Sequence, residues 1–368
     1  MNILYFISSS GNASGGHYHS LNQISKEVGK GNNVRIITTG PETSPVLSEN
    51  RFFLKHISIQ NNFKSLFILN KELKQIIKNF NPDILHCFDT DSLNRLLILP
   101  AVFHYPIILN KCGGPNPRRS NYQHANEIIV FSAENYDWFK MNRHYNNGEI
   151  HLIANRVEEL QFLPTNKRIE KKNNKIITFL RVTRIGGAYD KTLRDSFRMI
   201  EELMLHFPVQ LIIVGRIQDQ ERYQWFYNEA DNKKLPVQFI TDKRASKGAD
   251  FLYLADFVIG TGRSFMEALS LGIPTLTPAQ NANWPIIVNE RNFNDFFKTN
   301  FSERNKTDNK TIINNKDEII RLIKSQSAYY EAQESARTLF KKYFGTEHIL
   351  TKYNDVYRLV LSKPKLQK

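Results

Sequence analysis

The chain has 368 residues, of which 41% are apolar, 23% charged and 12% aromatic. This globular composition excludes a disordered chain, a collagen and a coiled coil, and the length predicts two domains or one large one. Fifty lysines and arginines against 36 acidic residues give a net charge of +14, which suits nucleic acid, an anionic membrane face or phosphorylated small molecules as partners.

Cysteine content and hydropathy indicate the compartment. Two cysteines, Cys87 and Cys112, cannot form a disulfide framework and lie in no zinc-binding pattern, which fits a reducing cytoplasm. The apolar run at the N-terminus is too short for a signal peptide, and no later run reaches the ~18 apolar residues of a membrane span. We therefore expect a cytoplasmic protein, soluble or peripheral.

Short apolar runs alternate with amphipathic segments from the first residue, which predicts an α/β architecture with parallel sheets. Between two such runs, an i, i+3, i+4 apolar stripe from Leu66 to Phe80 predicts a helix that Pro82 ends. The strands expected in the first half are Asn2–Ile7, Val34–Thr38, Phe52–Ile57, Asp83–Cys87, Pro106–Asn110, Glu127–Phe131 and His151–Ile153.

A polar, charged segment over 158–175 has the composition of a linker and predicts a domain boundary near residue 165. We assign residues 1–160 to one doubly wound domain and 161–345 to another, with a C-terminal helix in 346–368 that packs back on the first. The elements expected in the second half are the strands Ile176–Leu180, Val209–Val214, Val237–Thr241, Asp256–Ile259 and Pro274–Leu276, the helices Lys191–His206, Gln220–Asn232, Ala328–Phe344 and His348–Leu361, and a mobile loop over Asn300–Lys316.

Two glycine-containing turns stand between a strand and a helix. The first, SSSGNASGGHYH, leads through Gly15 and Gly16 into a helix that starts near His17, where free N–H groups favour an anion. Its spacing matches neither GxGxxG nor a P-loop, and an ordinary strand-to-helix turn remains the alternative.

The second turn lies in ADFVIGTGRSFMEALSLGIPTL, residues 255–276, and predicts a phosphate cradle at the start of a helix from Ser264. Arg263 could clamp a phosphate, and Glu267 could accept hydrogen bonds from a ribose diol. The alternative is that Ser264 and Glu267 form a capping box that serves the helix alone.

With six further segments in the same order, these two turns resemble the GT-B glycosyltransferases of family 4. The resemblance covers most of the chain and implies two Rossmann-like doubly wound domains facing a central cleft, the first binding the acceptor and the second a nucleotide-sugar donor. The six segments are PDILHCFD (82–89), EIIVFSAEN (127–135), HLIANRVE (151–158), FLRVTRIGGAYDKTL (179–193), LIIVGR (211–216) and VQFIT (237–241).

The resemblance assigns the donor site. Arg184 and Lys191 take the place of the basic pair that neutralises the donor diphosphate, with Arg181 as a competitor because the interval of seven residues is long. Glu267 takes the place of the acidic residue that holds the ribose, whereas the family's first glutamate falls on Ile259. Gly262, Arg263 and Ser264 match the turn that meets the diphosphate, and Gly15 and Gly16 are also expected to bind the donor.

On the acceptor side, the histidine that many relatives carry after the strand ending at Asn110 is absent, and Lys111 and Cys112 follow instead. His17 and Asp89 are the best placed polar candidates, ahead of His124 and Cys112. Lys111, Arg118 and Arg119 could form a basic patch that faces an acceptor or an anionic membrane.

The function that the resemblance implies is transfer of a sugar from a UDP- or GDP-sugar to a glycan or lipid-linked acceptor, with retention, in surface polysaccharide biosynthesis. No metal and no cofactor are expected, and the enzyme would work in the cytoplasm, at the inner face of the membrane. The alternatives are a nucleotide-sugar 2-epimerase or hydrolase-like enzyme on the same fold and a basic nucleic-acid-binding protein. The scattering of the basic residues disfavours nucleic acid.

Overall fold

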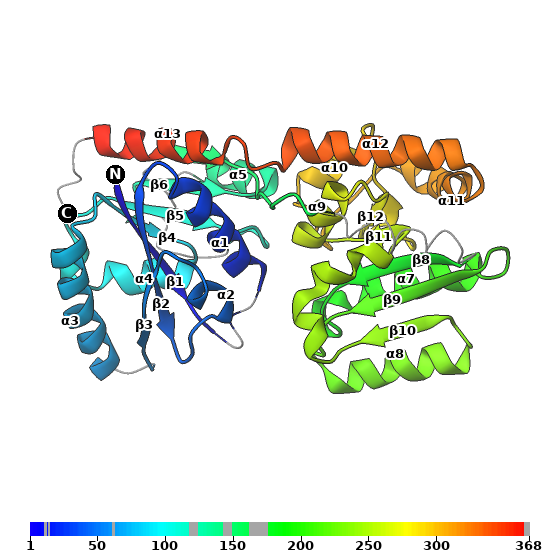
Figure 1. Ribbon diagram of the computed structural model, residues 1–368, viewed down its shortest axis with the longest axis horizontal. Helices are drawn as coiled ribbons and strands as arrows, with labels where there is room; N and C mark the ends of the chain where they lie inside the picture. The colour runs from blue at the N-terminus through cyan, green and yellow to red at the C-terminus, as the bar shows by residue number, and fades with distance from the viewer. Residues whose placement is uncertain are drawn as a thin grey trace. The chain divides into compact units, whose positions relative to one another are not determined.

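The structure is a computed structural model that describes residues 1–10, 13, 15–60, 63–117, 124–142, 149–161 and 176–363. The chain divides into two compact units, each described here by itself. The N-terminal unit comprises Met1–Arg156 and Thr346–Lys368, and the C-terminal unit comprises Val157–Gly345. Figure 1 shows the elements of both units.

The N-terminal unit is built on a seven-stranded sheet in the order β3-β2-β1-β4-β5-β6-β7, and every neighbouring pair is parallel. Each predicted strand is present within two residues of its expected ends. The strands are β1 (Asn2–Ser8), β2 (Asn33–Gly40), β3 (Phe53–Ser58), β4 (Ile84–Cys87), β5 (Ile107–Lys111), β6 (Glu127–Val130) and β7 (Glu149–Leu152).

Helices cover both faces of this sheet, because alternate residues of a buried parallel strand point to opposite sides. Tyr5 of β1 packs with α1 and α13, whereas Phe6 packs in the other core, with α3 and α4. The helices are α1 (Gly16–Val28), α2 (Pro45–Ser48), α3 (Phe63–Phe80), α4 (Thr90–Leu97), α5 (Ala133–Met141) and α13 (Ile349–Ser362), with a short 3-10 turn η1 (Pro100–Val102).

The C-terminal unit has a six-stranded sheet in the order β10-β9-β8-β11-β12-β13, parallel except for the β12–β13 pair. Strand β13 (Ile286–Ile287) was not predicted, since two residues leave no alternation to read. The other strands are β8 (Ile177–Val182), β9 (Val209–Val214), β10 (Val237–Ile240), β11 (Phe257–Ile259) and β12 (Thr275–Thr277).

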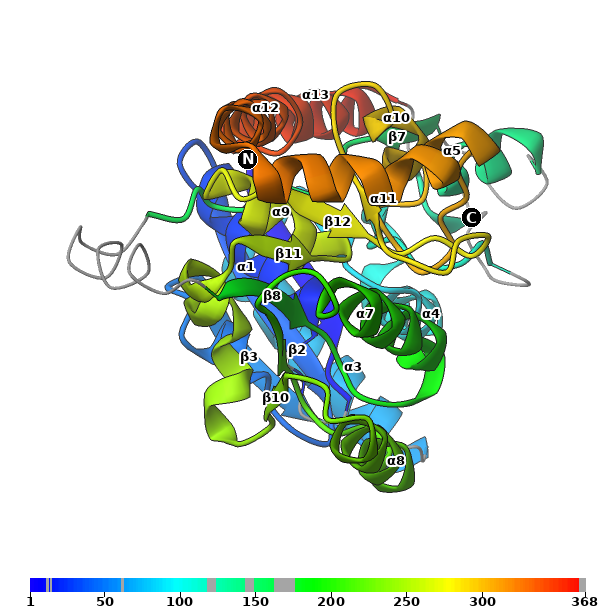
Figure 2. The same cartoon turned by 90° about the vertical axis from the view of Figure 1, so that its right-hand side faces the viewer.

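The second sheet is also covered on both faces. Phe179 and Phe257 stack in a core shared with α7, α8, α11 and α12, and Leu180 and Val258 face the 3-10 segment η5 and α9. Figure 2 shows α11 and α12 beside β11 and β12. The helical elements are α7 (Asp190–Leu203), α8 (Gln220–Asn232), η5 (Lys243–Leu254), α9 (Gly262–Ser270), α10 (Phe293–Phe297), α11 (Asn309–Lys324) and α12 (Gln326–Tyr343).

The expectation of a mobile loop over Asn300–Lys316 is wrong. Phe301 is fully buried, and its ring stacks on Phe265 with the ring centroids 3.8 Å apart. Helix α11 begins at Asn309, capped by the Asp308 side chain, which accepts a hydrogen bond from the Thr311 N–H. The polar composition reflects one solvated face of a helix rather than an absence of structure.

Two doubly wound sheets confirm the predicted fold class. In such sheets, ligands bind beyond the carboxyl ends of the parallel strands, which we call the carboxyl edge of each sheet. Among the described residues, no helix combines the length and apolar character needed to span a bilayer.

Candidate functional site

The start of α9 lies at the carboxyl edge of the second sheet, directly after β11. Gly262 has φ of +47°, in the left-handed region that glycine adopts without a steric cost. The Ser264 hydroxyl accepts a hydrogen bond from the Thr261 N–H at 3.1 Å and donates one to the Thr261 carbonyl at 3.1 Å. The capping box therefore joins Thr261 and Ser264, so the alternative of a box between Ser264 and Glu267 is wrong, and α9 begins at Gly262 instead of Ser264.

Because Glu267 takes no part in the capping box, its carboxylate is available to Arg263, one turn away. The Arg263 Nε and Glu267 Oε1 atoms are 2.7 Å apart, and the two side chains are 24% and 10% exposed. Burial raises the pKa of Glu267 above its ordinary value, an effect that Arg263 partly offsets. The Arg263 Nη1 atom is buried and has no hydrogen-bond partner in the described part of the chain, so one edge of the guanidinium is unsatisfied.

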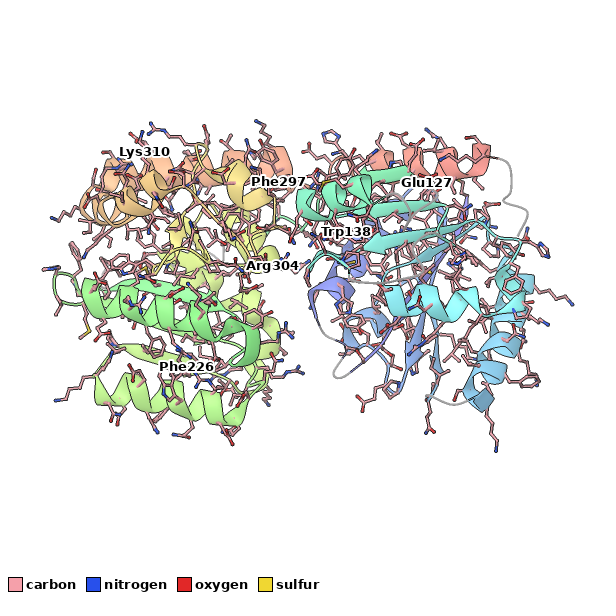
Figure 3. The ribbon with its side chains drawn as sticks, turned by 180° about the vertical axis from the view of Figure 1, so that it is seen from behind. Glu127, Trp138, Phe226, Phe297, Arg304 and Lys310 are labelled. Carbon is pink, nitrogen blue, oxygen red and sulfur yellow. The ribbon has the colours of Figure 1, made fainter. Side chains whose placement is uncertain are left out.

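The segment from Asn300 to Thr307 folds beside this helix start. The Gly262 N–H donates to the Phe301 carbonyl at 3.2 Å, and Asn300 and Phe301 both have positive φ. Asn305, fully buried, donates to the Pro278 carbonyl at 2.8 Å and thereby fixes the segment. Figure 3 shows Arg304 of this segment.

Three further buried polar atoms, Asn300 Oδ1, Glu303 Oε1 and Thr307 Oγ1, belong to this segment and have no partner within the described ranges. Buried polar atoms are nearly always hydrogen-bonded, so unpartnered ones beside a helix start make this place a candidate ligand site. Sequence analysis missed Asn300 and Glu303. The one available signal was an aromatic residue, Phe301, inside an otherwise polar segment.

The three basic residues predicted for the diphosphate, one within β8 and two after it, lie in different environments. Arg181 is fully buried, and its guanidinium donates to the Thr192 carbonyl at 2.5 Å and to the Ser196 hydroxyl at 2.8 Å. Burial lowers the pKa of Arg181 to about 10. The donor-binding role considered for Arg181 is therefore corrected, because its side chain braces the first turns of α7 instead of facing a ligand.

Arg184 and Lys191 remain accessible. The Arg184 Nη2 atom donates to the Tyr189 hydroxyl at 2.5 Å, and its guanidinium lies 4.9 Å from the centroid of the Tyr189 ring. The Lys191 Nζ atom lies 2.6 Å from Asp195 Oδ2 and donates to the Ala282 carbonyl at 2.8 Å, while 47% of its side chain is exposed. Both cations thus belong to the carboxyl edge, where β8 leads into α7.

At the carboxyl edge of the first sheet, Asp89 follows β4 and caps α4. Its two carboxylate oxygens accept hydrogen bonds from the Ser92 N–H at 2.6 Å and the Ser8 N–H at 2.7 Å. Burial raises the pKa of Asp89 to about 6, against the opposing effect of these two hydrogen bonds. The nearby Ser8 hydroxyl is buried without a partner in the region that the structure covers.

The other predicted loop residues lie at the start of α1. Gly15 is the N-cap and Gly16 the first helical residue, with no side-chain cap and no acidic residue in the first turn. This leaves α1 with the uncompensated N–H groups that an anion would use. Burial lowers the pKa of His17 to about 4, and its ring centroid lies 4.0 Å from that of Tyr18. His17 is therefore neutral at physiological pH.

The basic patch predicted for the acceptor side is only partly described. The Lys111 ammonium donates to the Gly113 carbonyl at 2.6 Å, and the Cys112 thiol donates to the Phe88 carbonyl at 3.5 Å. Burial raises the pKa of the Cys112 thiol, which opposes a role as a thiolate. His124 is exposed, and Arg118 and Arg119 lie outside the described residues.

One group of possible metal ligands lies at the opposite edge of the first sheet, where β6 and β7 begin. Glu127, Glu149 and His151 have ligand atoms within 4.8 Å of one another. The buried Glu127 carboxylate already contacts His151 Nε2 at 2.7 Å and the Lys363 ammonium at 2.5 Å. Because the Glu127 carboxylate is already paired with this cation, we assign no metal to the cluster.

A family model and solved structures both support the fold. Residues 3–109 match the family model described as glycosyl transferase 4-like. A comparison with curated protein sequences gives no match.

Many solved structures are similar over nearly the whole chain. A glycosyltransferase from Rickettsia africae has a TM-score of 0.71 at 16% identity, covering 98% of this chain and 99% of its own. HepE from Anabaena, solved in complex with UDP, has a TM-score of 0.68 at 14% identity, covering 98% and 100%. A putative UDP-N-acetylglucosamine 2-epimerase from Listeria monocytogenes has a TM-score of 0.61 at 12% identity, covering 99% and 98%.

The resemblance to GT-B glycosyltransferases that the sequence motifs indicated is thereby confirmed: residues 3–109 match the glycosyl transferase 4-like family, and the chain as a whole has the GT-B fold.

Proposed function

We propose that the protein is a glycosyltransferase that moves a sugar from a UDP-sugar, or a GDP-sugar, to a glycan or lipid-linked acceptor. The observation that carries this proposal is the group of unpartnered buried atoms at and beside the start of α9, which includes Arg263 Nη1, Asn300 Oδ1 and Glu303 Oε1. The family match over residues 3–109 and the UDP bound to the similar HepE support it.

In the proposed reaction, the bond between the anomeric carbon and the diphosphate oxygen breaks as negative charge develops on the leaving group. Arg184, Lys191 and Arg263, with the N–H groups at the start of α9, would stabilise that charge, since fixed cations and dipoles need no reorganisation during reaction. Glu267, held by Arg263, would accept hydrogen bonds from the ribose. The Glu303 carboxylate would accept them from the donor sugar, in place of the family's missing first glutamate.

On the acceptor domain, Gly15, Gly16, His17 and Asp89 would line the reacting face. We propose retention of configuration without a metal: the acceptor oxygen bonds to the anomeric carbon, and its proton passes to the departing phosphate oxygen. Asp89 would then orient the acceptor instead of taking its proton, because both its oxygens already accept backbone hydrogen bonds. A role in surface polysaccharide biosynthesis, at the cytoplasmic face of a membrane, completes the proposal.

Calorimetric titration with UDP, GDP and ADP tests this function. We expect saturable binding of one uridine or guanosine diphosphate, and at least tenfold weaker binding by Arg263→Ala. Lys316→Ala, a cation exposed elsewhere on the same unit, should bind like the wild type. Failure of all three nucleotides, together with salt-sensitive binding of a single-stranded oligonucleotide, would instead favour the nucleic-acid alternative.

A second candidate on the same fold is a nucleotide-sugar 2-epimerase, favoured by the similarity to the Listeria protein. Incubation with a UDP-sugar and no acceptor separates the two. An epimerase would interconvert sugar epimers or release free sugar and UDP, whereas a transferase would leave the donor nearly intact until an acceptor is added.

A further inference from the structure

One face of α3 combines lysines with exposed apolar side chains. The residues of this face recur at intervals of three and four, so they lie along one side of the helix. We call them the α3 basic face, and all are exposed: Lys64, Phe67, Ile68, Lys71, Lys74, Gln75 and Lys78. The opposite side of α3, with Leu69 and Leu73, is buried in the core of the N-terminal unit.

The two apolar residues on this face are unusually accessible. Phe67 is 74% exposed and Ile68 is 49% exposed, adjacent in the second turn of the helix. Lys64 lies one turn before them and Lys71 one turn after. An exposed aromatic and an exposed aliphatic side chain at one spot cost free energy in water, which favours a partner that buries them.

The charge of the face is not neutralised within the unit. None of its four lysines forms an ion pair with any residue that the structure describes, and the acidic residue of α3, Glu72, is engaged by Lys55 of β3 at 2.6 Å. The face therefore presents four free ammonium groups around an apolar pair, within the described part of the chain.

The position of the face relates it to the proposed acceptor site. Strand β3 ends at Ser58, at the carboxyl edge of the first sheet, and α3 begins at Phe63. Phe67 and Ile68 thus lie in the second turn of α3, the part of the helix that follows the carboxyl edge of the sheet. Figure 1 shows α3 along the margin of the N-terminal unit, next to β3.

We propose that the α3 basic face docks the protein on an anionic lipid bilayer, with Phe67 and Ile68 inserted among the lipids and the lysines on the headgroup phosphates. A helix with this division of charge and apolar surface is suited to lie in the membrane interface. The inference rests on the proposed function and assigns its membrane contact to α3, in place of the basic patch predicted from the sequence. A lipid-linked acceptor would then reach the carboxyl edge directly from the membrane.

The chemistry of the face favours lipid over other partners. A second copy of the chain would bring lysines against lysines. Nucleic acid would neutralise the ammonium groups but would leave Ile68 in water, because a phosphate backbone offers it no apolar surface. A bilayer satisfies both kinds of side chain.

Vesicle flotation tests the proposal with the full chain. We expect the wild type to float with phosphatidylcholine vesicles containing phosphatidylglycerol and not with phosphatidylcholine alone. Phe67→Ala with Lys71→Glu should weaken binding about tenfold or more. The matched control is Ile313→Ala with Lys310→Glu on α11, where Ile313 is also 74% exposed; it makes the same change in charge and should bind as the wild type does.

Tryptophan fluorescence distinguishes insertion into the bilayer from charge attraction to its surface. The emission of a Phe67→Trp variant should shift to shorter wavelength on anionic vesicles relative to the wild type, whereas that of Ile313→Trp should not. Equal loss of binding in the α3 variant and the α11 control, absence of a shift at position 67, or binding only to an oligonucleotide or to a second copy would overturn the proposal.

Nucleotide titration of the same variants separates this inference from the proposed function. The α3 variant should bind UDP or GDP with the affinity of the wild type, because α3 belongs to the other unit. Binding to vesicles without binding to any nucleotide would contradict the proposed function alone. Binding to a nucleotide without binding to vesicles would contradict the membrane contact alone.

Discussion

Arg263 and Glu267 depend on one another, because each is a charged group in a partly buried position. Arg263→Leu leaves the Glu267 carboxylate without its cation, and we expect the free energy of unfolding to fall by about 3 kcal/mol. Removing both charges, with Glu267→Leu added, should restore much of this loss, since no unpaired charge then remains. Urea denaturation measures both values. If the double variant is as unstable as the single one, the pair does not act through its charge.

Asp89 gives a pH dependence of known sign. Its pKa is about 6 in the folded protein, against 3.8 as its ordinary value, so the folded state holds this proton more tightly than the unfolded state. The favourable contribution to stability is present below pH 4 and is lost as the pH rises from about 4 to about 6. Wild type should thus lose on the order of 2 kcal/mol across this window relative to Asp89→Asn.

Urea denaturation at a series of pH values between 4 and 7 measures this difference. The side-chain amide oxygen that Asp89→Asn introduces can still accept one hydrogen bond at the N-cap, so the variant should fold. Asp137→Asn, at an exposed position of α5, is the control and should keep the wild-type slope. Parallel slopes in wild type and Asp89→Asn would show that Asp89 does not titrate in this window.

At the scale of elements, the segment that holds the start of α9 offers the clearest test. Phe301→Ala removes a buried ring that stacks on Phe265, and we expect a loss of about 3 to 4 kcal/mol of stability. Because the Phe301 carbonyl accepts the Gly262 N–H, nucleotide affinity should fall as well. Phe297→Ala, four residues earlier and only half-buried, should lower stability less and leave nucleotide affinity unchanged. If Phe301→Ala binds the nucleotide with unchanged affinity, the segment from Asn300 to Thr307 does not contribute to the donor site.

The same elements show how far sequence reasoning reaches. The strands and α8 were predictable, since runs such as Val209–Val214 are short, rich in β-branched residues and bounded by Pro208 and Gly215, which favours a buried strand. The cap of α9 was not, because Thr261, Ser264 and Glu267 form two overlapping capping patterns and only the end of β11 decides between them. Likewise, the sequence cannot tell Arg181 from Arg184, because burial beneath α7 is a tertiary property.

At the scale of the whole molecule, α13 completes the core of the N-terminal unit. The Tyr357 hydroxyl lies 2.7 Å from the Tyr5 hydroxyl and 3.0 Å from His86 Nδ1, and Tyr353 donates to Asn110 Oδ1 at 2.7 Å. Burial lowers the pKa of His86 to about 3, so this network contains a neutral imidazole. A helix from the far end of the sequence thus supplies polar partners to three central strands.

Scanning calorimetry measures how much the unit depends on α13. Tyr357→Ala should lower the melting temperature of the N-terminal unit by several degrees. The substitution opens a cavity and leaves the buried His86 and Tyr5 side chains without their hydrogen-bond partner. The C-terminal unit should melt as before, and its transition is the one that an added nucleotide diphosphate should raise. Tyr330→Ala, at a half-exposed position of α12, is the control. A shift in both transitions, or in neither, would contradict this division.

The path of the chain through the two units also sets an order of assembly. Synthesis runs from the N-terminus, so Met1–Arg156 leaves the ribosome first, yet α13 is made only after the whole of Val157–Gly345. The C-terminal unit is contiguous and can finish folding while the first unit still exposes the surface of Tyr5 and Ile3 that α13 covers. The half of the protein that is translated first is therefore the half that matures last, and it is the one a chaperone would need to shield.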